Sequence, residues 1–133
     1  DHRDLHSFPT RRSSDLLLEI KPIFSKNILL NLIKLTKKIK KCGIISFKEK
    51  NIIDLYKLNK KLSLGLLFSS TADLKKIKLK SKLPHVKFLV LEKKFLSSNS
   101  LKIIKKPTFY YTIKSKRLFK KYKDNKNLIF ENL

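Results

Sequence analysis

Apolar residues recur at helical spacing in two stretches of the chain, residues 24–41 and residues 49–64. Ser25 stands near the start of the first stretch and is a suitable N-cap residue. Gly43 and Gly65 follow the two stretches and are expected to end them. The pattern therefore predicts two amphipathic helices. The apolar face predicted for the first consists of Ile28, Leu32, Leu35 and Ile39.

Short apolar runs with strand-forming residues follow each predicted helix. Residues 43–47 and 66–68 are two such runs, and residues 86–95 have the strongest strand pattern because they are rich in valine and phenylalanine. Around Pro107, residues 101–114 predict two short extended pieces, the second with side chains alternating between two faces.

The last part of the chain continues this mixture of elements. Ser115 is expected to cap a short helix that runs to Tyr122, and residues 128–130 start another strand. The basic stretch 75–85 predicts no element. The order is helix, strand, helix and then strands, which is typical of the α+β class. We expect an N-terminal layer with this order, followed by an incomplete, mainly β C-terminal part.

The first sixteen residues differ in composition from the rest of the chain. They hold three of the four arginines and two of the three histidines. Their sequence, DHRDLHSFPTRRSSDL, resembles the translation of a standard short-read sequencing adapter at every position. We therefore expect residues 1–16 to be an adapter-derived artefact and exclude them from functional inference. The chain contains no methionine, so we also expect its native N-terminus to be missing.

The remaining residues are strongly basic. The chain has 33 Lys and Arg residues against ten Asp and Glu, a formal net charge of +23, and residues 1–16 contribute none of it. Self-repulsion of this size favours a polyanionic partner such as nucleic acid. A codon bias towards A and T accounts for lysine in place of arginine, but it does not account for the excess of bases over acids. Lysines interrupt every apolar run, so no membrane span is predicted.

Sequence signatures of enzymes are absent. The chain has no glycine-rich phosphate loop, no nucleophile elbow and no pair of metal-binding histidines. Cys42 is the single cysteine, and after residue 16 His85 is the single histidine; neither has partners at ligand spacing. We expect no enzyme activity, no catalytic residues, no metal, no cofactor and no small-molecule substrate.

The most informative stretch is residues 99–121, NSLKIIKKPTFYYTIKSKRLFKK. Its lysines suit phosphates, its hydroxyl groups suit sugar and phosphate oxygens, and its aromatic rings suit unpaired bases. A half-buried edge strand with a solvated lysine face gives the same pattern. The residues alone leave both interpretations open.

The spacing within this stretch resembles a known family. The segment Ile-Lys-x-Ile-Ser-Lys-Pro-Gly/Ser of the eighth small-subunit ribosomal protein, in its bacterial and organellar form, is similar to Leu101-Lys102-x-Ile104-x-Lys106-Pro107-Thr108. The upstream run VKFLVLEKKF is similar to the strand that precedes this segment in the family. The family's late Ser-Thr-Ser-Lys-Gly loop has no match near Glu131, which predicts truncation before this loop or its divergence.

The resemblance implies a structural constituent of the small ribosomal subunit that binds and helps to assemble the central domain of its RNA. It implies an N-terminal α+β domain over residues 17–96 and the start of a truncated, RNA-binding β domain over residues 97–133. Ribosomal RNA and neighbouring ribosomal proteins would be the partners in translation, and the composition favours a mitochondrial or plastid ribosome. The residues expected to contact RNA are Lys37, Lys38, Lys40, Lys41, Lys48, Lys50, Lys102, Lys105, Lys106, Thr108 and Tyr110.

Two alternatives remain open at this point. The chain could be a nonspecific basic module for nucleic acid or an anionic membrane surface, or a translated fragment without function. A salt series distinguishes specific from nonspecific binding, because nonspecific affinity for all polyanions falls in parallel as salt rises.

Overall fold

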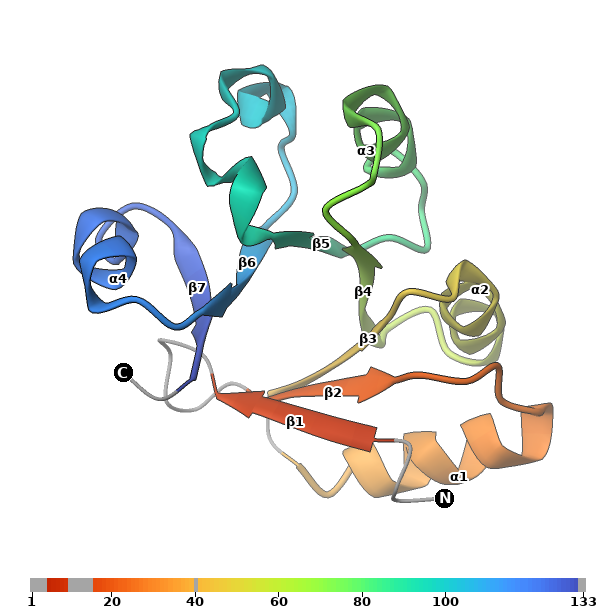
Figure 1. Ribbon diagram of the computed structural model, residues 1–133. Coiled ribbons are helices and arrows are strands. Elements are labelled where there is room, and N and C mark those ends of the chain that lie inside the picture. Colours follow the sequence, from red (N-terminus) through yellow and green to blue (C-terminus); the bar gives the residue numbers. More distant parts are fainter. Residues whose placement is uncertain (1–4, 10–15, 40, 132–133) are drawn as a thin grey trace.

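The structure is a computed structural model that describes residues 5–9, 16–39 and 41–131, with side chains from residue 16 onward. Strands and helices alternate through most of this range (Figure 1). The strands are β1 (Leu5–Pro9), β2 (Leu16–Ile20), β3 (Cys42–Ser46), β4 (Ser63–Phe68), β5 (Phe88–Glu92), β6 (Thr108–Ile113) and β7 (Asn127–Phe130). The helices are α1 (Lys26–Thr36), α2 (Glu49–Leu58), α3 (Leu74–Lys80) and α4 (Lys116–Tyr122), with 3₁₀ helices η2 (Lys93–Ser97) and η3 (Asn99–Ile103).

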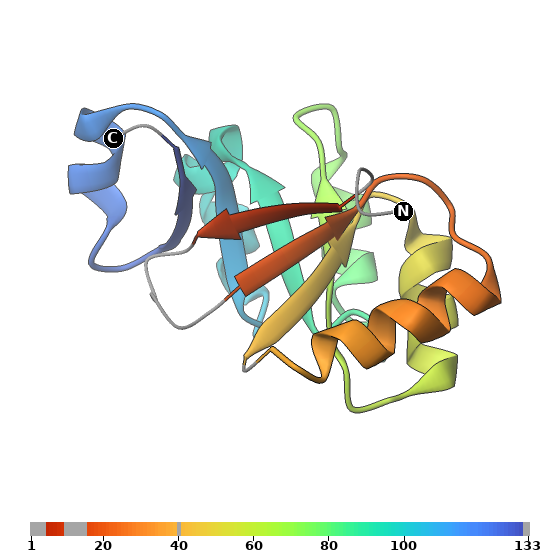
Figure 2. The same ribbon diagram turned by 90° about the horizontal axis from the view of Figure 1, so that it is seen from below.

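The seven strands form one sheet in which the spatial order is the order of the chain. Strands β2 to β7 are all parallel to their neighbours, whereas β1 pairs with β2 in the antiparallel direction. The parallel part, which we call the arc, curls so that all the helices lie on its convex side (Figures 1 and 2). This arrangement is typical of α/β proteins in which each parallel strand is followed by a crossover helix. Since β1 lies in the adapter-like stretch, we look for a functional site on the arc alone.

The predicted mixture of helices and strands is confirmed, but the predicted α+β layout is wrong. The C-terminal part is not mainly β, because α4 connects two parallel strands there. The basic stretch 75–85 contains most of α3, and residues 99–103 form η3 in place of an extended piece. These elements are crossovers between neighbouring parallel strands. Strands β5 and β6 pair across the expected domain boundary at residue 97.

Apolar side chains cover both faces of the sheet, as expected for parallel strands. In β5, Leu89 and Leu91 belong to the core between the sheet and the helices. Phe88 and Val90 belong to a second core on the concave face, which we call the inner core. The other buried members of the inner core are Leu17, Ile45, Leu67 and Ile129.

Local signals in the sequence were reliable for two helix starts. The hydroxyl groups of Ser25 and Ser115 accept hydrogen bonds from the backbone N–H groups of Ile28 and Leu118, so both predicted N-caps are confirmed. The predicted apolar face of α1 is only partly right, because Ile28 is exposed. The face that packs on the sheet consists of Leu29, Leu32, Ile33 and Thr36.

The two glycines do not end helices, which corrects that prediction. Gly43 lies in β3 and Gly65 lies in β4. A Cβ atom at Gly65 would lie 2.3 Å from the ring of Phe88. Glycine is therefore required there because the aromatic ring of the inner core passes directly over the backbone.

Candidate functional site

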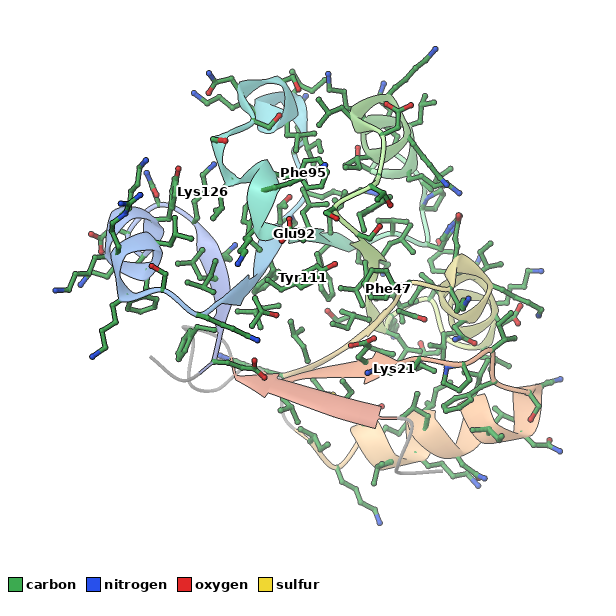
Figure 3. All side chains as sticks on the ribbon, viewed as in Figure 1. Lys21, Phe47, Glu92, Phe95, Tyr111 and Lys126 are labelled. Carbon is green, nitrogen blue, oxygen red and sulfur yellow. The ribbon has the colours of Figure 1, made fainter. Side chains whose placement is uncertain are left out.

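The C-terminal ends of the strands of the arc meet at one edge, because all six strands run in the same direction. In parallel α/β barrels and open sheets this edge carries the ligand-binding and catalytic groups. Figure 3 labels several of the side chains found here. We call this set the C-terminal rim. It consists of Glu19 at the end of β2, Lys21 just after it, Phe47 after β3, Glu92 at the end of β5 and Tyr111 in β6.

Glu19 is the most buried member of the C-terminal rim. It lies two residues after Leu17, so both side chains project from the concave face of β2. Only 7% of Glu19 is exposed while β1 pairs with β2, where His6 lies opposite Glu19. The ion pairs and side-chain hydrogen bonds found within residues 16–39 and 41–131 do not involve its carboxylate. Glu19 also lines a small cavity at the rim, where a bound ligand can contact it.

Lys21 follows Glu19 by two residues and is exposed at the open side of the rim. A lysine ammonium is a mobile point charge that suits phosphate or carboxylate groups. The sequence places a carboxylate and an exposed cation two residues apart at the end of one strand. The rim can therefore bind an anionic group at Lys21 and exchange a proton, or hold a cation, at Glu19.

Tyr111 forms the opposite wall of the rim. Its hydroxyl group donates a hydrogen bond of 2.9 Å to the backbone carbonyl of Phe68, which ties β6 to the end of β4. Its ring meets the ring of Phe47 edge-on, with centroids 6.3 Å apart. Burial and, after it, the negative charges of Glu92 and Glu19 raise the pKa of Tyr111 to about 12. The phenol therefore stays protonated at neutral pH and holds its position.

Glu92 and a small cavity complete the rim. The carboxylate of Glu92 accepts a hydrogen bond of 2.8 Å from the backbone N–H of Lys94, which caps η2. A cavity of about 30 Å³ lies among Glu19, Tyr111 and apolar side chains of the inner core. This volume is enough for a water molecule.

The carboxylate oxygens of Glu19 and Glu92 are of the kind that Mg²⁺ and Ca²⁺ prefer as ligands. Within the described residues, however, no three His, Cys, Asp or Glu side chains gather as a metal site.

A separate charged cluster joins α2, α3 and the loop before β5. Glu49 pairs with Lys80 and, through a 2.8 Å contact, with His85 Nε2. Burial alone would raise the pKa of Glu49, but the hydrogen bonds and charges of Lys80 and His85 outweigh it and lower this pKa. The cluster joins neighbouring helices, and His85 lies in the turn before β5.

The structure distributes the residues predicted to bind RNA over both ends of the arc. Lys41, Lys105 and Thr108 lie at the N-terminal ends of β3 and β6, whereas Lys48 and Lys50 lie beyond the C-terminal end of β3. Lys37 and Lys38 follow α1, and Lys102 lies in η3. Lys40 is outside the described residues. The structure therefore does not bring the whole set onto one surface.

Two of these residues, Lys106 and Tyr110, have structural roles. Lys106 donates hydrogen bonds to the carbonyls of Leu83 and Val86 at 2.8 and 2.6 Å, and burial together with the charge of Lys87 lowers its pKa. Tyr110 is only 6% exposed, faces the helices, and has its pKa raised by burial. Its ring is not available for stacking on a base.

Sequence reasoning did not find the C-terminal rim. The signal at Glu19 is a run of three leucines followed by Glu, Ile and Lys, which contains no recognisable motif. Tyr111 lies in the extended piece that the sequence predicts after Pro107, and its position opposite Glu19 depends on the curl of the sheet. Comparison of the chain with protein-family models and with curated proteins finds no match. Within the described residues, no helix is long and apolar enough to span a membrane.

Proposed function

We propose that this chain carries the catalytic rim of a βα-barrel type of enzyme that acts on a small anionic substrate. Glu19 is the observation that carries the proposal. It is a carboxylate on the concave face at the C-terminal end of a parallel strand, it lines the rim cavity, and Lys21 is two residues away. A fold alone assigns no activity, so the proposal depends on these side chains. It departs from the sequence-based expectation of a non-enzyme, which rested on missing motifs.

Each residue of the rim has its own role in the proposed reaction. Lys21 binds the anionic group of the substrate, and the positive field of the chain attracts anions to the site. Glu19 transfers a proton as general base or acid, in a position that the inner core shields from water. The hydroxyl proton of Tyr111 is donated to the backbone carbonyl of Phe68, so Tyr111 holds the wall of the site in place. The half-exposed ring of Phe47 offers an apolar contact to the rest of the substrate.

Turnover of chromogenic nitrophenyl substrates tests this proposal. The panel contains a phosphomonoester, a phosphodiester, a carboxylic ester and a neutral glycoside, each with and without Mg²⁺. We expect turnover of a phosphoester, a loss of at least about 100-fold in kcat for Glu19→Gln, and a raised KM for Lys21→Met. Lys34→Met is the matched control, because Lys34 is an exposed lysine on α1, which lies on the convex side of the arc and outside the rim. Absence of turnover, or equal effects of Lys21→Met and Lys34→Met, contradicts the proposal.

Binding to RNA is the second candidate function. The observation that favours it is the excess of positive charge, which is spread over α3, η3, α4 and the loops. A role as a structural protein of the small subunit in a mitochondrial or plastid ribosome stays a proposal based on the resemblance of residues 101–108. Among the described residues, the predicted lysine contacts whose side chains form no hydrogen bond or ion pair are Lys37, Lys38, Lys41, Lys48, Lys102 and Lys105.

A salt series with a small-subunit ribosomal RNA fragment and with heparin tests this second candidate. Specific binding keeps a preference for the RNA fragment as the salt concentration rises. Lys37→Gln with Lys38→Gln is expected to weaken binding and to reduce the salt slope by about 2. Lys106→Met is the contrasting variant, because it should lower stability rather than affinity. A parallel loss of affinity for both polyanions would leave only a nonspecific basic module.

A further inference from the structure

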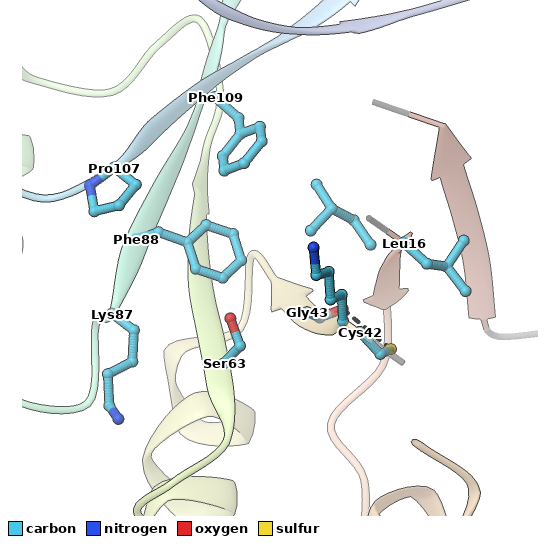
Figure 4. A pocket seen from close by; sticks show the side chains of 10 residues that line it. Leu16, Cys42, Gly43, Ser63, Lys87, Phe88, Pro107 and Phe109 are labelled. Carbon is cyan, nitrogen blue, oxygen red and sulfur yellow. Dashed lines mark hydrogen bonds between the residues drawn. The ribbon is translucent and has the colours of Figure 1, made fainter. Parts of the chain in front are cut away.

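The concave side of the arc is not completely filled. A hollow of about 360 Å³ opens among the N-terminal halves of β2 to β6 (Figure 4). Its walls include Leu17, Phe88 and Phe109, with Lys41 and Lys87 at the margin. The interior of a closed parallel barrel is a packed core and not a pore. An apolar hollow of this size therefore indicates that further side chains belong there.

The two ends of the arc are also unfinished. Strand β7 pairs with β6 on one side, and within the described residues it has no ladder partner on the other. The outer side of β2 is occupied by β1, which is the one antiparallel strand among the described residues. Strand β1 also lies against β7, so the space between the two ends of the arc accepts strands (Figure 2). The residues of β1 belong to the stretch that resembles a sequencing adapter.

We infer that the arc is the larger part of a closed barrel and is completed by two further strand–helix units of the same polypeptide. Closure of a parallel βα barrel takes eight strands, and the arc supplies six of them in sequential order with outer helices. The added strands run parallel to β2 and β7 and fill the hollow beside Phe88 and Phe109. A unit from the same polypeptide continues the rule that neighbours in the sheet are neighbours in the chain.

Completion also affects the C-terminal rim, and this part of the inference depends on the proposed function. The C-terminal ends of the two added strands would lie between Glu19 on β2 and the end of β7. They would bring further polar side chains to the open side of Glu19. The arc already carries the anion-binding and proton-transfer groups that turnover requires, and the completed barrel should raise kcat by enclosing them.

The test has two steps, beginning with the native transcript that encodes residues 17–131. We expect an open reading frame that extends this region by two segments, each with an apolar strand followed by an amphipathic helix. The extended protein and residues 17–133 alone are then compared by binding of the dye anilinonaphthalene sulfonate and by amide hydrogen exchange. Residues 17–133 should bind the dye and exchange quickly at β2 and β7, and the extended protein should do neither.

Two variants of residues 17–133 locate the dye. Phe109→Ser should reduce dye binding, because Phe109 lines the hollow, whereas Ile103→Ser should not, because Ile103 is 64% exposed on η3. The inference is overturned if the transcript encodes no such segments, or if residues 17–133 fold cooperatively without binding the dye. An extended protein that closes the barrel but turns over no substrate refutes the proposed enzyme and leaves the barrel intact.

Discussion

Substitution of Gly65 by alanine tests the packing of the inner core directly. The new Cβ atom would lie 2.3, 2.5 and 2.7 Å from three ring atoms of Phe88. The ring is 6% exposed and packs edge-on against Phe109 with centroids 5.6 Å apart, so it can move away from Gly65 only by disturbing this contact. Overpacking of this kind costs about 1–3 kcal/mol. Loss of glycine flexibility in the unfolded chain returns about 0.4–1 kcal/mol.

We therefore expect Gly65→Ala to lower the free energy of unfolding by roughly 1–2 kcal/mol. For a domain of this size the midpoint of thermal unfolding falls by about 5–10 °C. Urea denaturation followed by far-ultraviolet circular dichroism measures the change, because the chain has no tryptophan. Gly43→Ala is the matched control. Its Cβ atom would lie 2.8 Å from a terminal methyl group of Leu17, which can rotate away, so its cost should be smaller.

A double-mutant cycle isolates the contact between Gly65 and Phe88. Phe88→Leu removes the ring atoms that the new Cβ atom would meet, and alone it should cost about 1 kcal/mol. In the double variant the two costs should not add, and a coupling of at least about 0.5 kcal/mol should remain. Strict additivity, or a neutral Gly65→Ala, would refute the conclusion that the aromatic ring requires glycine at this position.

Local contacts give three further predictions. Ser115→Ala removes the acceptor for the N–H of Leu118 and should lower the free energy of unfolding by about 1 kcal/mol, measured in urea; Ser115→Asn should restore it. Glu49 has a lowered pKa in the folded chain, so its stabilisation is complete above the ordinary value of 4.5 and is lost as the pH falls through the folded pKa. In the Glu49→Gln variant, the free energy of unfolding measured in urea should depend less on pH across that acidic range. An unchanged pH dependence would contradict a stabilising role of the charged cluster. Tyr111, with a pKa of about 12, should ionise last in an alkaline absorbance titration, and Tyr111→Phe should remove that final step.

The sequence predicted elements well where the signal is local. Helices α1 and α2 have enough turns to show their apolar period, and the serine caps act on residues three positions away. Helix α3 was missed because its seven residues bury only Ile77, so its period is hidden among lysines. The parallel direction of the sheet was also missed. Strand β5 is apolar on both faces, which is the signal of a parallel strand that the order of elements alone did not reveal.

The candidate site was less predictable than the fold. Glu19 and Lys21 come from one strand end, and their spacing of two residues was visible in the sequence. Glu92 and Tyr111 come from strands three and four places further along the sheet. Only the curl of the arc brings the carboxylate of Glu92 and the ring of Tyr111 opposite Glu19. Such a site depends on which strands are neighbours in the curled sheet, and the sequence did not reveal this. The basic composition pointed to lysines as functional residues.

The scarcity of acids makes Glu19 the informative residue of this chain. Residues 17–133 contain seven acidic side chains, since three of the ten lie in residues 1–16. Most of them have an evident structural role, because Asp73 and Glu92 cap helices, and Glu49, Asp54 and Glu131 pair with neighbouring cations. Glu19 has no such role among the described residues, although it is the one acid buried in the inner face. In a chain with so many lysines, Glu19 faces the rim cavity and forms no ion pair among the described residues, so it is the residue whose substitution tests the proposed function most directly.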